Sequence, residues 1–180
     1  KLLSVKEEVS PEAWKNCEFI EGDIRDRKCL FEVFSKRKID IVSHQAALGS
    51  VPRSIEDPIA SFDVNVSGFV NVLEAARCSG VERFVYASSS SVYGDNEDAI
   101  KRENDTGKVL SPYAATKAQN EEWAGVVSRV YKLESVGLRY FNVFGARQDP
   151  SGPYAAVIPR WLARLVKNEP CVIYGDGKTS

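Results

Sequence analysis

The stretch DPIASFDVNVSGFVNVLEAARCSGVERFVYASSS, residues 57–90, decides the fold class because it joins an amphipathic helix to an apolar strand. Phe62, Val66 and Phe69 recur at the spacing of one helical face. An Asp-Pro pair opens this helical part and a glycine ends it, and both are typical boundary signals. Residues 82–88, which contain the apolar run Phe84 to Ala87, follow at once and predict a strand that ends in serines. A helix followed directly by a buried strand is typical of α/β proteins.

The rest of the chain continues this alternation. Helices are expected at residues 10–16, 26–38, 57–80, 111–131 and 154–168, and strands at residues 17–24, 39–47, 82–88, 134–145 and 171–175. Strands that alternate with helices and carry continuous apolar runs are typical of a parallel sheet covered on both faces. The sequence therefore predicts an α/β fold with a doubly wound parallel sheet.

Composition narrows the class of protein. The chain has 180 residues, of which 43% are hydrophobic and 27% charged, as is usual for a globular protein. A net charge of −1 gives no electrostatic reason to expect nucleic acid or an anionic membrane as a partner, and no apolar run approaches the ~20 residues that cross a bilayer. The four cysteines lack metal-site spacing, so we expect buried reduced thiols in a cytoplasmic protein. The single histidine, His44, cannot form a metal site alone, and no metal is expected.

Polar residues follow several of the predicted strands. They are Asp23, the segment 44–47, the serines at 88–91 and Asn142. Because ligands of open α/β sheets bind beyond the carboxyl ends of the strands, these residues form the candidate site. The histidine at the start of the segment 44–47 is expected to be a structural strand-end residue and not a catalyst.

Tyr113 and Lys117 carry the spacing of a catalytic pair. Four residues apart on one helix, they lie on the same face, and Ser111-Pro112 starts that helix, so Tyr113 falls in its first turn. A tyrosine that acts as a base near neutral pH needs its anion stabilised by about 4 kcal/mol, and a neighbouring ammonium and a helix N-terminus both contribute to this. Taken alone, this spacing often arises by chance, and a serine run is usually a solvated turn. Their joint arrangement with Asn142 favours a catalytic site.

Several segments together resemble one family. The segments GDIRD, HQAA, NVSG, YASSSSVYG, SPYAATK and LRYFNVFG are similar to those of the extended short-chain dehydrogenase/reductases, the NAD-dependent epimerase/dehydratase family that modifies nucleotide sugars. The segments HQAALGSVPRS and RQDPSGPYAAVIPRW resemble most the UDP-N-acetylglucosamine 4-epimerases of that family. The resemblance runs through nearly the whole chain. It implies a Rossmann-like sheet, NAD as the cofactor and a UDP-sugar as the substrate.

The resemblance also implies a role for each matching residue. Ser89, Tyr113 and Lys117 would be catalytic, with Tyr113 as the base, Ser89 bound to the sugar 4-hydroxyl and Lys117 bound to the nicotinamide ribose. The NAD site would comprise Asp23, Ile24, Gln45, Ala46, Ala47, Val64, Tyr113, Lys117 and Phe141. The UDP-sugar site would comprise Ser50, Arg53, Ser89, Ser90, Tyr113, Asn142, Ala156, Val157, Trp161, Val172, Tyr174 and Gly175.

The same resemblance divides the chain into two parts. Residues 1–146 would form the NAD-binding domain without its first strand–helix–strand unit, and so without the family's glycine-rich phosphate loop. Residues 147–180 would be part of the substrate-binding domain. The helices within residues 57–79 and 112–131 resemble those that pair in the family's dimer, so a homodimer is expected.

The implied reaction is 4-epimerisation of a UDP-hexose, UDP-N-acetylglucosamine or UDP-N-acetylgalactosamine, through a 4-keto sugar. Two alternatives stay open: a nucleotide-sugar dehydratase or decarboxylase, and a non-catalytic dinucleotide-binding regulator of the same fold. Dehydratases of the family resemble one another in carrying Thr-Asp-Glu before Val-Tyr-Gly, where this chain has Ser89, Ser90 and Ser91. A serine hydroxyl cannot replace a carboxylic acid–base group near neutral pH, so the sequence favours epimerisation.

Overall fold

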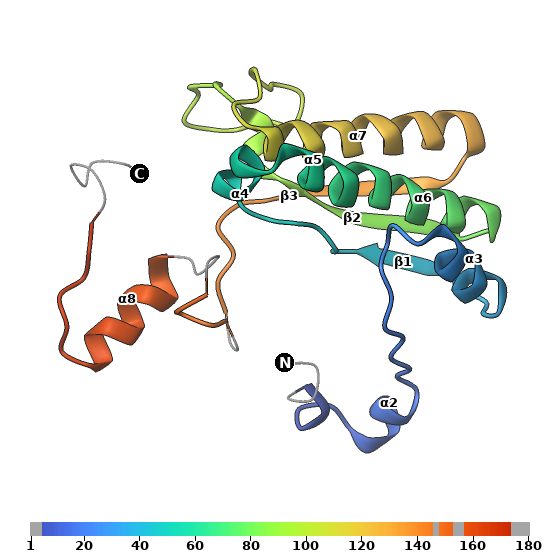
Figure 1. Cartoon of the computed structure of the whole chain (residues 1–180), viewed down its shortest axis with the longest axis horizontal. Helices are drawn as coiled ribbons and strands as arrows, with labels where there is room; N and C mark the ends of the chain where they lie inside the picture. The colour runs from blue at the N-terminus through green and yellow to red at the C-terminus, as the bar shows by residue number, and fades with distance from the viewer. Residues whose placement is uncertain (1–4, 146–147, 153–156, 174–180) are drawn as a thin grey trace. The chain divides into compact units, whose positions relative to one another are not determined.

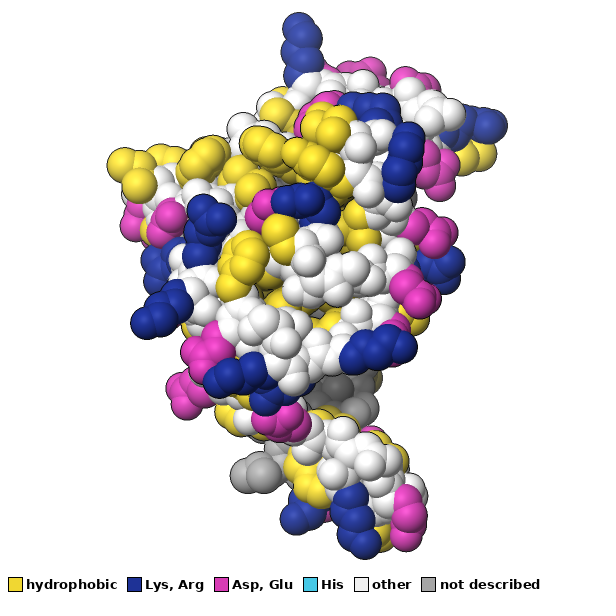
Figure 2. Space-filling model, turned by 90° about the vertical axis from the view of Figure 1, so that its right-hand side faces the viewer, with side chains coloured by type: hydrophobic (Ala, Val, Ile, Leu, Met, Phe, Trp, Pro, Cys, Tyr) yellow, Lys and Arg dark blue, Asp and Glu magenta, His cyan; other side chains and the backbone are white. Residues whose placement is uncertain are grey.

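The computed structural model describes residues 5–145, 148–152 and 157–173, which fall into two compact units. Residues 21–141 form the larger unit, and the described residues before 21 and after 141 form the smaller one. No helix within the described ranges is long and apolar enough to cross a membrane. The face shown in Figure 2 carries basic and acidic side chains interspersed, in keeping with the net charge of −1.

A parallel sheet forms the centre of the larger unit (Figure 1). Its described strands are β1 (Ile41–His44), β2 (Arg83–Ser89) and β3 (Glu134–Tyr140), in the order β1-β2-β3. Val85 of β2 is paired with Ser43 of β1 and with Val136 of β3. The strands run in one direction, so their carboxyl ends meet at the same edge of the sheet. The predicted parallel, Rossmann-like α/β fold is confirmed.

Helices connect these strands. Helix α3 (Arg27–Ser35) precedes β1, helices α4 (Val51–Glu56), α5 (Pro58–Phe62) and α6 (Phe69–Cys78) lie between β1 and β2, and helix α7 (Pro112–Tyr131) lies between β2 and β3. A turn of π-helix, Asp63–Gly68, joins α5 to α6, and a 3-10 turn, Ser90–Tyr93, follows β2. Figure 1 shows α6 and α7 side by side along one face of the sheet.

The core of the larger unit lies between these helices and the sheet. Phe69 and Leu73 of α6 pack with Phe84 and Tyr86 of β2, and all four are buried. Alternate residues of β2 face this core, as expected for a strand with a side-chain period of two. On the opposite face of the sheet, Val136 is 40% exposed. The helix-covered face therefore supplies the buried apolar surface that stabilises this unit.

The expectations for residues 17–24 and for the cysteines are wrong. Residues 17–24 do not form a strand: Phe19 and Ile20 are 69% and 41% exposed, and in the part of the chain that the structure describes no strand lies beside this segment. The cysteines are free but not fully buried, since Cys17 and Cys78 are exposed and the other two are half-buried. Cys78 is the last residue of α6, where the helix leaves the core.

The smaller unit contains two described helices. Helix α2 (Pro11–Lys15) follows its N-cap Ser10, whose hydroxyl accepts a hydrogen bond from the Ala13 amide, as is typical of a serine at this position. Helix α8 is Val157–Val166. The strand expected at residues 171–175 is absent over 171–173, and its last two residues lie outside the described ranges.

Candidate functional site

Lys117 lies at the centre of the candidate site in the larger unit. Its side chain reaches the end of β2, where Nζ donates a hydrogen bond of 2.8 Å to the carbonyl oxygen of Ala87. The same nitrogen lies 6.0 Å from the centre of the Tyr113 ring, so the structure brings these two predicted residues together. Lys117 is 2% exposed, and this burial lowers its pKa to about 8. A buried cation therefore lies one helical turn from the tyrosine, as the spacing in the sequence predicted.

The backbone of Tyr113 is held by helix α4. The Tyr113 amide donates a hydrogen bond of 3.0 Å to the Ser54 hydroxyl, which itself donates to the Val51 carbonyl at 2.7 Å. Ser54 is fully buried. Ser111 caps helix α7, to which Tyr113 belongs, by accepting a hydrogen bond from the Ala114 amide. The first turn of α7 is therefore fixed both by its own cap and by a neighbouring helix.

Asn65 connects three parts of the site, and sequence reasoning gave it no role. Its Nδ2 donates to the Leu48 carbonyl at 3.0 Å and to the Thr116 hydroxyl at 3.2 Å, while its Oδ1 accepts from the Leu48 amide at 2.7 Å. Thr116 donates in turn to the Tyr113 carbonyl at 2.7 Å. Asn65 is 1% exposed and lies in the π-helical turn, a feature frequent at functional sites. Two signals were available in the sequence: an asparagine on an otherwise apolar helical face, and its place in the segment NVSG.

The serines at the end of β2 have different partners. The Ser88 hydroxyl points toward the helices and donates to Glu121 Oε1 at 2.5 Å. Ser89 is half-buried, and its hydroxyl accepts from the Ser91 amide at 3.1 Å and from the Ser91 hydroxyl at 2.9 Å. Ser90 begins the 3-10 turn. Ser89 thus lies two residues after the carbonyl that binds Lys117.

His44 is packed inside the unit, as expected of a structural residue. Its ring is stacked on Phe84 at 6.0 Å and lies edge-on to Phe69 at 5.3 Å. Burial, and then the charge of Lys117, lower the pKa of His44 to about 4. The imidazole is therefore neutral near pH 7.

Asp23 and Ile24, predicted to bind adenine, lie in a turn before α3. Hydrogen bonds from Arg25 hold the Asp23 carboxylate and lower its pKa to about 2. Asn71 donates to the carbonyls of Ile24 and Arg25, both at 3.3 Å. The Ile24 side chain lies against Gly68, where a Cβ would be 2.7 Å from its Cδ1. This turn is thus held on α6 by close packing that needs a glycine.

Other predicted residues of the larger unit lie on loops and turns. Just after β1, Gln45 and Ala46 are exposed and Ala47 is half-buried. Val64 is half-buried in the π-helical turn, and Arg53 is exposed on α4. Ser50 caps α4 through a bond from the Arg53 amide and has a φ of 101°, a strained value for a residue with a side chain. Phe141 follows β3, and its exposed ring lies 5.9 Å from that of Tyr93.

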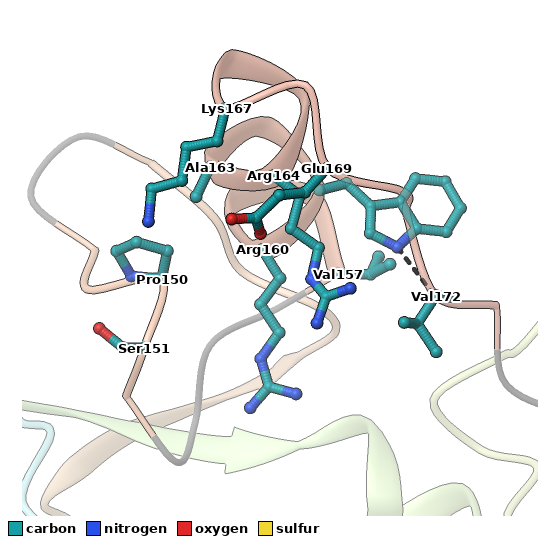
Figure 3. A pocket seen from close by; sticks show the side chains of 10 residues that line it. Pro150, Ser151, Val157, Arg160, Ala163, Arg164, Lys167, Glu169 and Val172 are labelled. Carbon is teal, nitrogen blue, oxygen red and sulfur yellow. Dashed lines mark hydrogen bonds between the residues drawn. The ribbon is translucent and has the colours of Figure 1, made fainter.

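The smaller unit has a pocket of its own, with a volume of about 520 Å³ (Figure 3). Three predicted residues line it: Val157, Trp161 and Val172, and Trp161 Nε1 donates to the Val172 carbonyl at 3.0 Å. Sequence reasoning missed its charged residues, which are Arg160, Arg164, Lys167 and Glu169. Their signal was present, because basic residues at i, i+4 and i+7 lie on one side of a helix. An excess of cations suits an anionic ligand.

Four predicted residues remain. Asn142 is exposed in the loop after β3. Ala156, Tyr174 and Gly175 lie outside the described residues.

Comparison with known proteins identifies the class of this Rossmann-like chain. The model of the NAD dependent epimerase/dehydratase family matches residues 2–180, so the chain belongs to this family. It is 39% identical over 173 residues to a putative UDP-glucose 4-epimerase of Methanocaldococcus jannaschii, covering 96% of this chain and 55% of the relative. It is 31% identical to a dTDP-D-glucose 4,6-dehydratase of Dictyostelium discoideum, covering 92% of this chain and 40% of that relative.

A solved structure is similar as well. The UDP-N-acetylglucosamine 4-epimerase of Methanobrevibacter ruminantium, in complex with UDP-N-acetylmuramic acid, has a TM-score of 0.82 and 38% identity, over 88% of this chain and 50% of that one. The chain spans about half the length of the curated relatives it matches.

Proposed function

We propose that this protein is a UDP-hexose 4-epimerase that interconverts UDP-N-acetylglucosamine and UDP-N-acetylgalactosamine with bound NAD. The observation that carries the proposal is the arrangement of Tyr113 and Lys117 beside the serine-ended strand β2. The similarity to a UDP-N-acetylglucosamine 4-epimerase supports the choice of substrate class.

The residues present fit the cofactor of the family. Asp23 offers an ionised carboxylate for the adenine amine, Ala46 and Ala47 offer small side chains that permit close approach, and Lys117 offers an ammonium for ribose hydroxyls. Gln45, Val64 and Phe141 would line the remaining surface. When bound, NAD supplies a hydride acceptor for carbon 4 of the sugar.

The chain's own residues would handle the proton and the alignment. Tyr113 would remove the proton of the 4-hydroxyl, because it lies in the first turn of α7 next to the buried charge of Lys117. Ser89 would donate a hydrogen bond to the same sugar oxygen, with Ser90 beside it. Tyr113 would return the proton after the 4-keto sugar has rotated in the site and presents its other face.

The smaller unit would bind the nucleotide. Trp161 and Val172 provide an apolar surface for the uridine, and the cations Arg160 and Arg164 suit a diphosphate. Asn142, Ala156, Val157, Tyr174 and Gly175 would complete this site. Ser50 and Arg53 would face the sugar from the N-terminal end of α4, where the small residues Gly49 and Ser50 leave room for an acetamido group.

Dehydration is the competing activity, since dehydratases are among the relatives. The positions that would need a carboxylic acid and a base are Ser90 and Ser91 here. The Ser91 hydroxyl already donates to Ser89. Serines can bind a sugar hydroxyl but cannot remove the carbon 5 proton, so the chemistry would stop at epimerisation. A regulator without catalysis would have no need of the Tyr113 and Lys117 pair.

The domain boundary, assembly and location are parts of the same proposal. Residues 1–146 would belong to the NAD-binding domain and 147–180 to the substrate-binding domain of a cytoplasmic homodimer. The dimer contact would use α5 and α7, because Ile59 and Phe62 on α5 and Trp123 on α7 are apolar and 80%, 49% and 46% exposed.

Product analysis tests the proposal. The protein at its full encoded length would be incubated with UDP-N-acetylglucosamine and followed by NMR, with UDP-glucose as the comparison. An equilibrium mixture with UDP-N-acetylgalactosamine is expected, with the higher kcat/KM for the acetamido sugar. A 4-keto-6-deoxy product would make the protein a dehydratase, and tight NAD binding without turnover of any UDP-sugar would make it a regulator.

A further inference from the structure

A three-residue chain of polar contacts links β2, α7 and β3 beside the site. The Ser88 hydroxyl donates to Glu121 Oε1 at 2.5 Å. Arg139 of β3 donates to both oxygens of the same carboxylate, from Nε to Oε1 at 2.9 Å and from Nη2 to Oε2 at 2.7 Å. This two-point geometry fixes the plane of the carboxylate, and it is the strongest form of an arginine ion pair.

The contacts are shielded from water. The side chains of Arg139 and Glu121 are 16% and 23% exposed, and Ser88 is 3% exposed. Burial raises the pKa of Glu121. The hydrogen bonds from Arg139 and Ser88 lower it by more, so the pKa of this carboxyl stays below its usual range. Arg139 also lies over the Tyr93 ring at 4.8 Å and donates to the Glu103 carbonyl at 2.9 Å. Each of the three guanidinium nitrogens of Arg139 thus donates a hydrogen bond within the larger unit.

Together with Lys117, these contacts fix the position of α7 along β2. Lys117 binds the carbonyl of Ala87, and Glu121, one helical turn later, binds the side chain of the next strand residue, Ser88. A single contact would let the helix pivot about it, whereas two contacts one turn apart set both its rotation and its shift along the strand. The residue that follows is Ser89.

We propose that Glu121 and Arg139 are positioning residues for the reaction. Through Ser88 they hold the end of β2 against α7, so that Ser89 and the first turn of α7 are aligned on the same sugar oxygen. This inference rests on the proposed function for its catalytic part, and its structural part stands on the contacts alone.

The chain offers a matched control for a merely structural contact. About one helical turn further along the same helix, the Ser135 hydroxyl of β3 donates to the Ala124 carbonyl of α7 at 3.3 Å. Ser88→Ala and Ser135→Ala each remove one hydroxyl that binds a strand to α7. They differ in distance along α7 from Tyr113.

The kinetic test compares these variants and Glu121→Gln in the protein at its full encoded length. Ser88→Ala and Glu121→Gln should lower kcat by about tenfold or more, as expected for a small misplacement of reacting groups. Their KM for the UDP-sugar and Kd for NAD should stay within about twofold, because no binding group is removed. Ser135→Ala should keep kcat within about twofold, because it leaves the contacts of Lys117 and Glu121 with β2 in place. Equal effects of Ser88→Ala and Ser135→Ala on kcat would overturn the catalytic part.

Amide hydrogen exchange tests the structural part without any turnover. Peptides that cover residues 85–91 and 111–117 should exchange faster in Ser88→Ala and Glu121→Gln, and at the wild-type rate in Ser135→Ala. Unchanged exchange in Ser88→Ala would overturn the inference. A wild-type protein that converts no UDP-sugar would contradict the proposed function, and the exchange result would then still decide whether Glu121 and Arg139 hold the strand end.

Discussion

The ammonium nitrogen of Lys117 lies 2.8 Å from the carbonyl oxygen of Ala87, and this contact ties helix α7 to the end of strand β2. The same side chain lies 6.0 Å from the ring of Tyr113. One buried cation therefore binds the strand end and lies beside the ring of the proposed base. The consequences for stability and for rate can be separated by experiment.

The first prediction concerns the stability contributed by Lys117. Its pKa is lowered to about 8 in the folded chain, while an unfolded lysine keeps a value near 10.5. Between these values the unfolded chain binds a proton that the folded chain does not, so the free energy of unfolding rises with pH from 8 toward 10.5. Lys117→Met should abolish this rise of the free energy of unfolding. Urea denaturation at pH 7.5 and pH 9.5, about 2 pH units apart, measures it. The same substitution at the exposed Lys28 is the control and should leave the rise intact.

The second prediction concerns the proton base. Tyr113→Phe should lower kcat by at least ~10²-fold, the scale of general acid–base catalysis, while the KM for the UDP-sugar changes little. The ring and its backbone bond to Ser54 stay in place, so the unfolding midpoint should match that of the wild type. Steady-state kinetics and thermal denaturation measure the two quantities. Turnover near the wild-type value would remove Tyr113 from the mechanism.

Much of this site was predictable because it depends on local spacing. Tyr113 and Lys117 are one helical turn apart whatever the tertiary structure, and a strand that ends in serines places them at the carboxyl edge of a parallel sheet. The contacts of the π-helical turn were not predictable, because Asn65 in this turn binds Leu48, a loop residue 17 positions away. Contacts of that kind appear only when the chain is folded.

The errors have a similar origin. Residues 17–24 have the apolar composition of a strand, but a strand forms only beside a partner, and the described chain offers none there. The cations around Trp161 were overlooked because their spacing shows only that they share one side of a helix, whereas the folded chain places them together around a pocket.

The third prediction concerns His44, the only histidine of the chain. Its pKa of about 4 lies below the unfolded value of 6.5, so the unfolded chain binds a proton first as the pH falls. The free energy of unfolding should therefore drop between pH 6.5 and 4, by up to about 3 kcal/mol from this residue. NMR of the imidazole gives the pKa directly, and a His44→Gln variant should lose this part of the pH dependence. Titration of the imidazole near 6.5 would contradict the packing described for its ring.

The fourth prediction concerns Asn65. Asn65→Leu should destabilise the protein strongly, because it leaves the amide and carbonyl of Leu48 without their partner, at about 1–3 kcal/mol for each buried group. It should also weaken NAD binding, since the Leu48 loop follows Gln45 and Ala46. Asn120 is the matched control: it is equally buried at 1% exposure, but its side-chain oxygen has no partner in the described structure. Asn120→Leu should cost less in urea denaturation, and an equal cost would show that burial alone decides.

The last prediction concerns Gly68 and the turn proposed to bind adenine. A Cβ at position 68 would lie 2.7 Å from both Cγ1 and Cδ1 of Ile24, so Gly68→Ala should push the turn of Asp23 and Ile24 away from α6. The expected loss is about 1–3 kcal/mol of stability, as for overpacking of a core, together with weaker NAD binding. Gly125→Ala on α7 is the control, because its nearest neighbour is the movable end of Arg129 at 3.3 Å and alanine favours helix.

Adding Ile24→Ala to Gly68→Ala removes the clash and should restore part of both losses, measured by urea denaturation and NAD titration. A double variant as impaired as the sum of its single variants would show that Gly68 matters for another reason than its contact with Ile24.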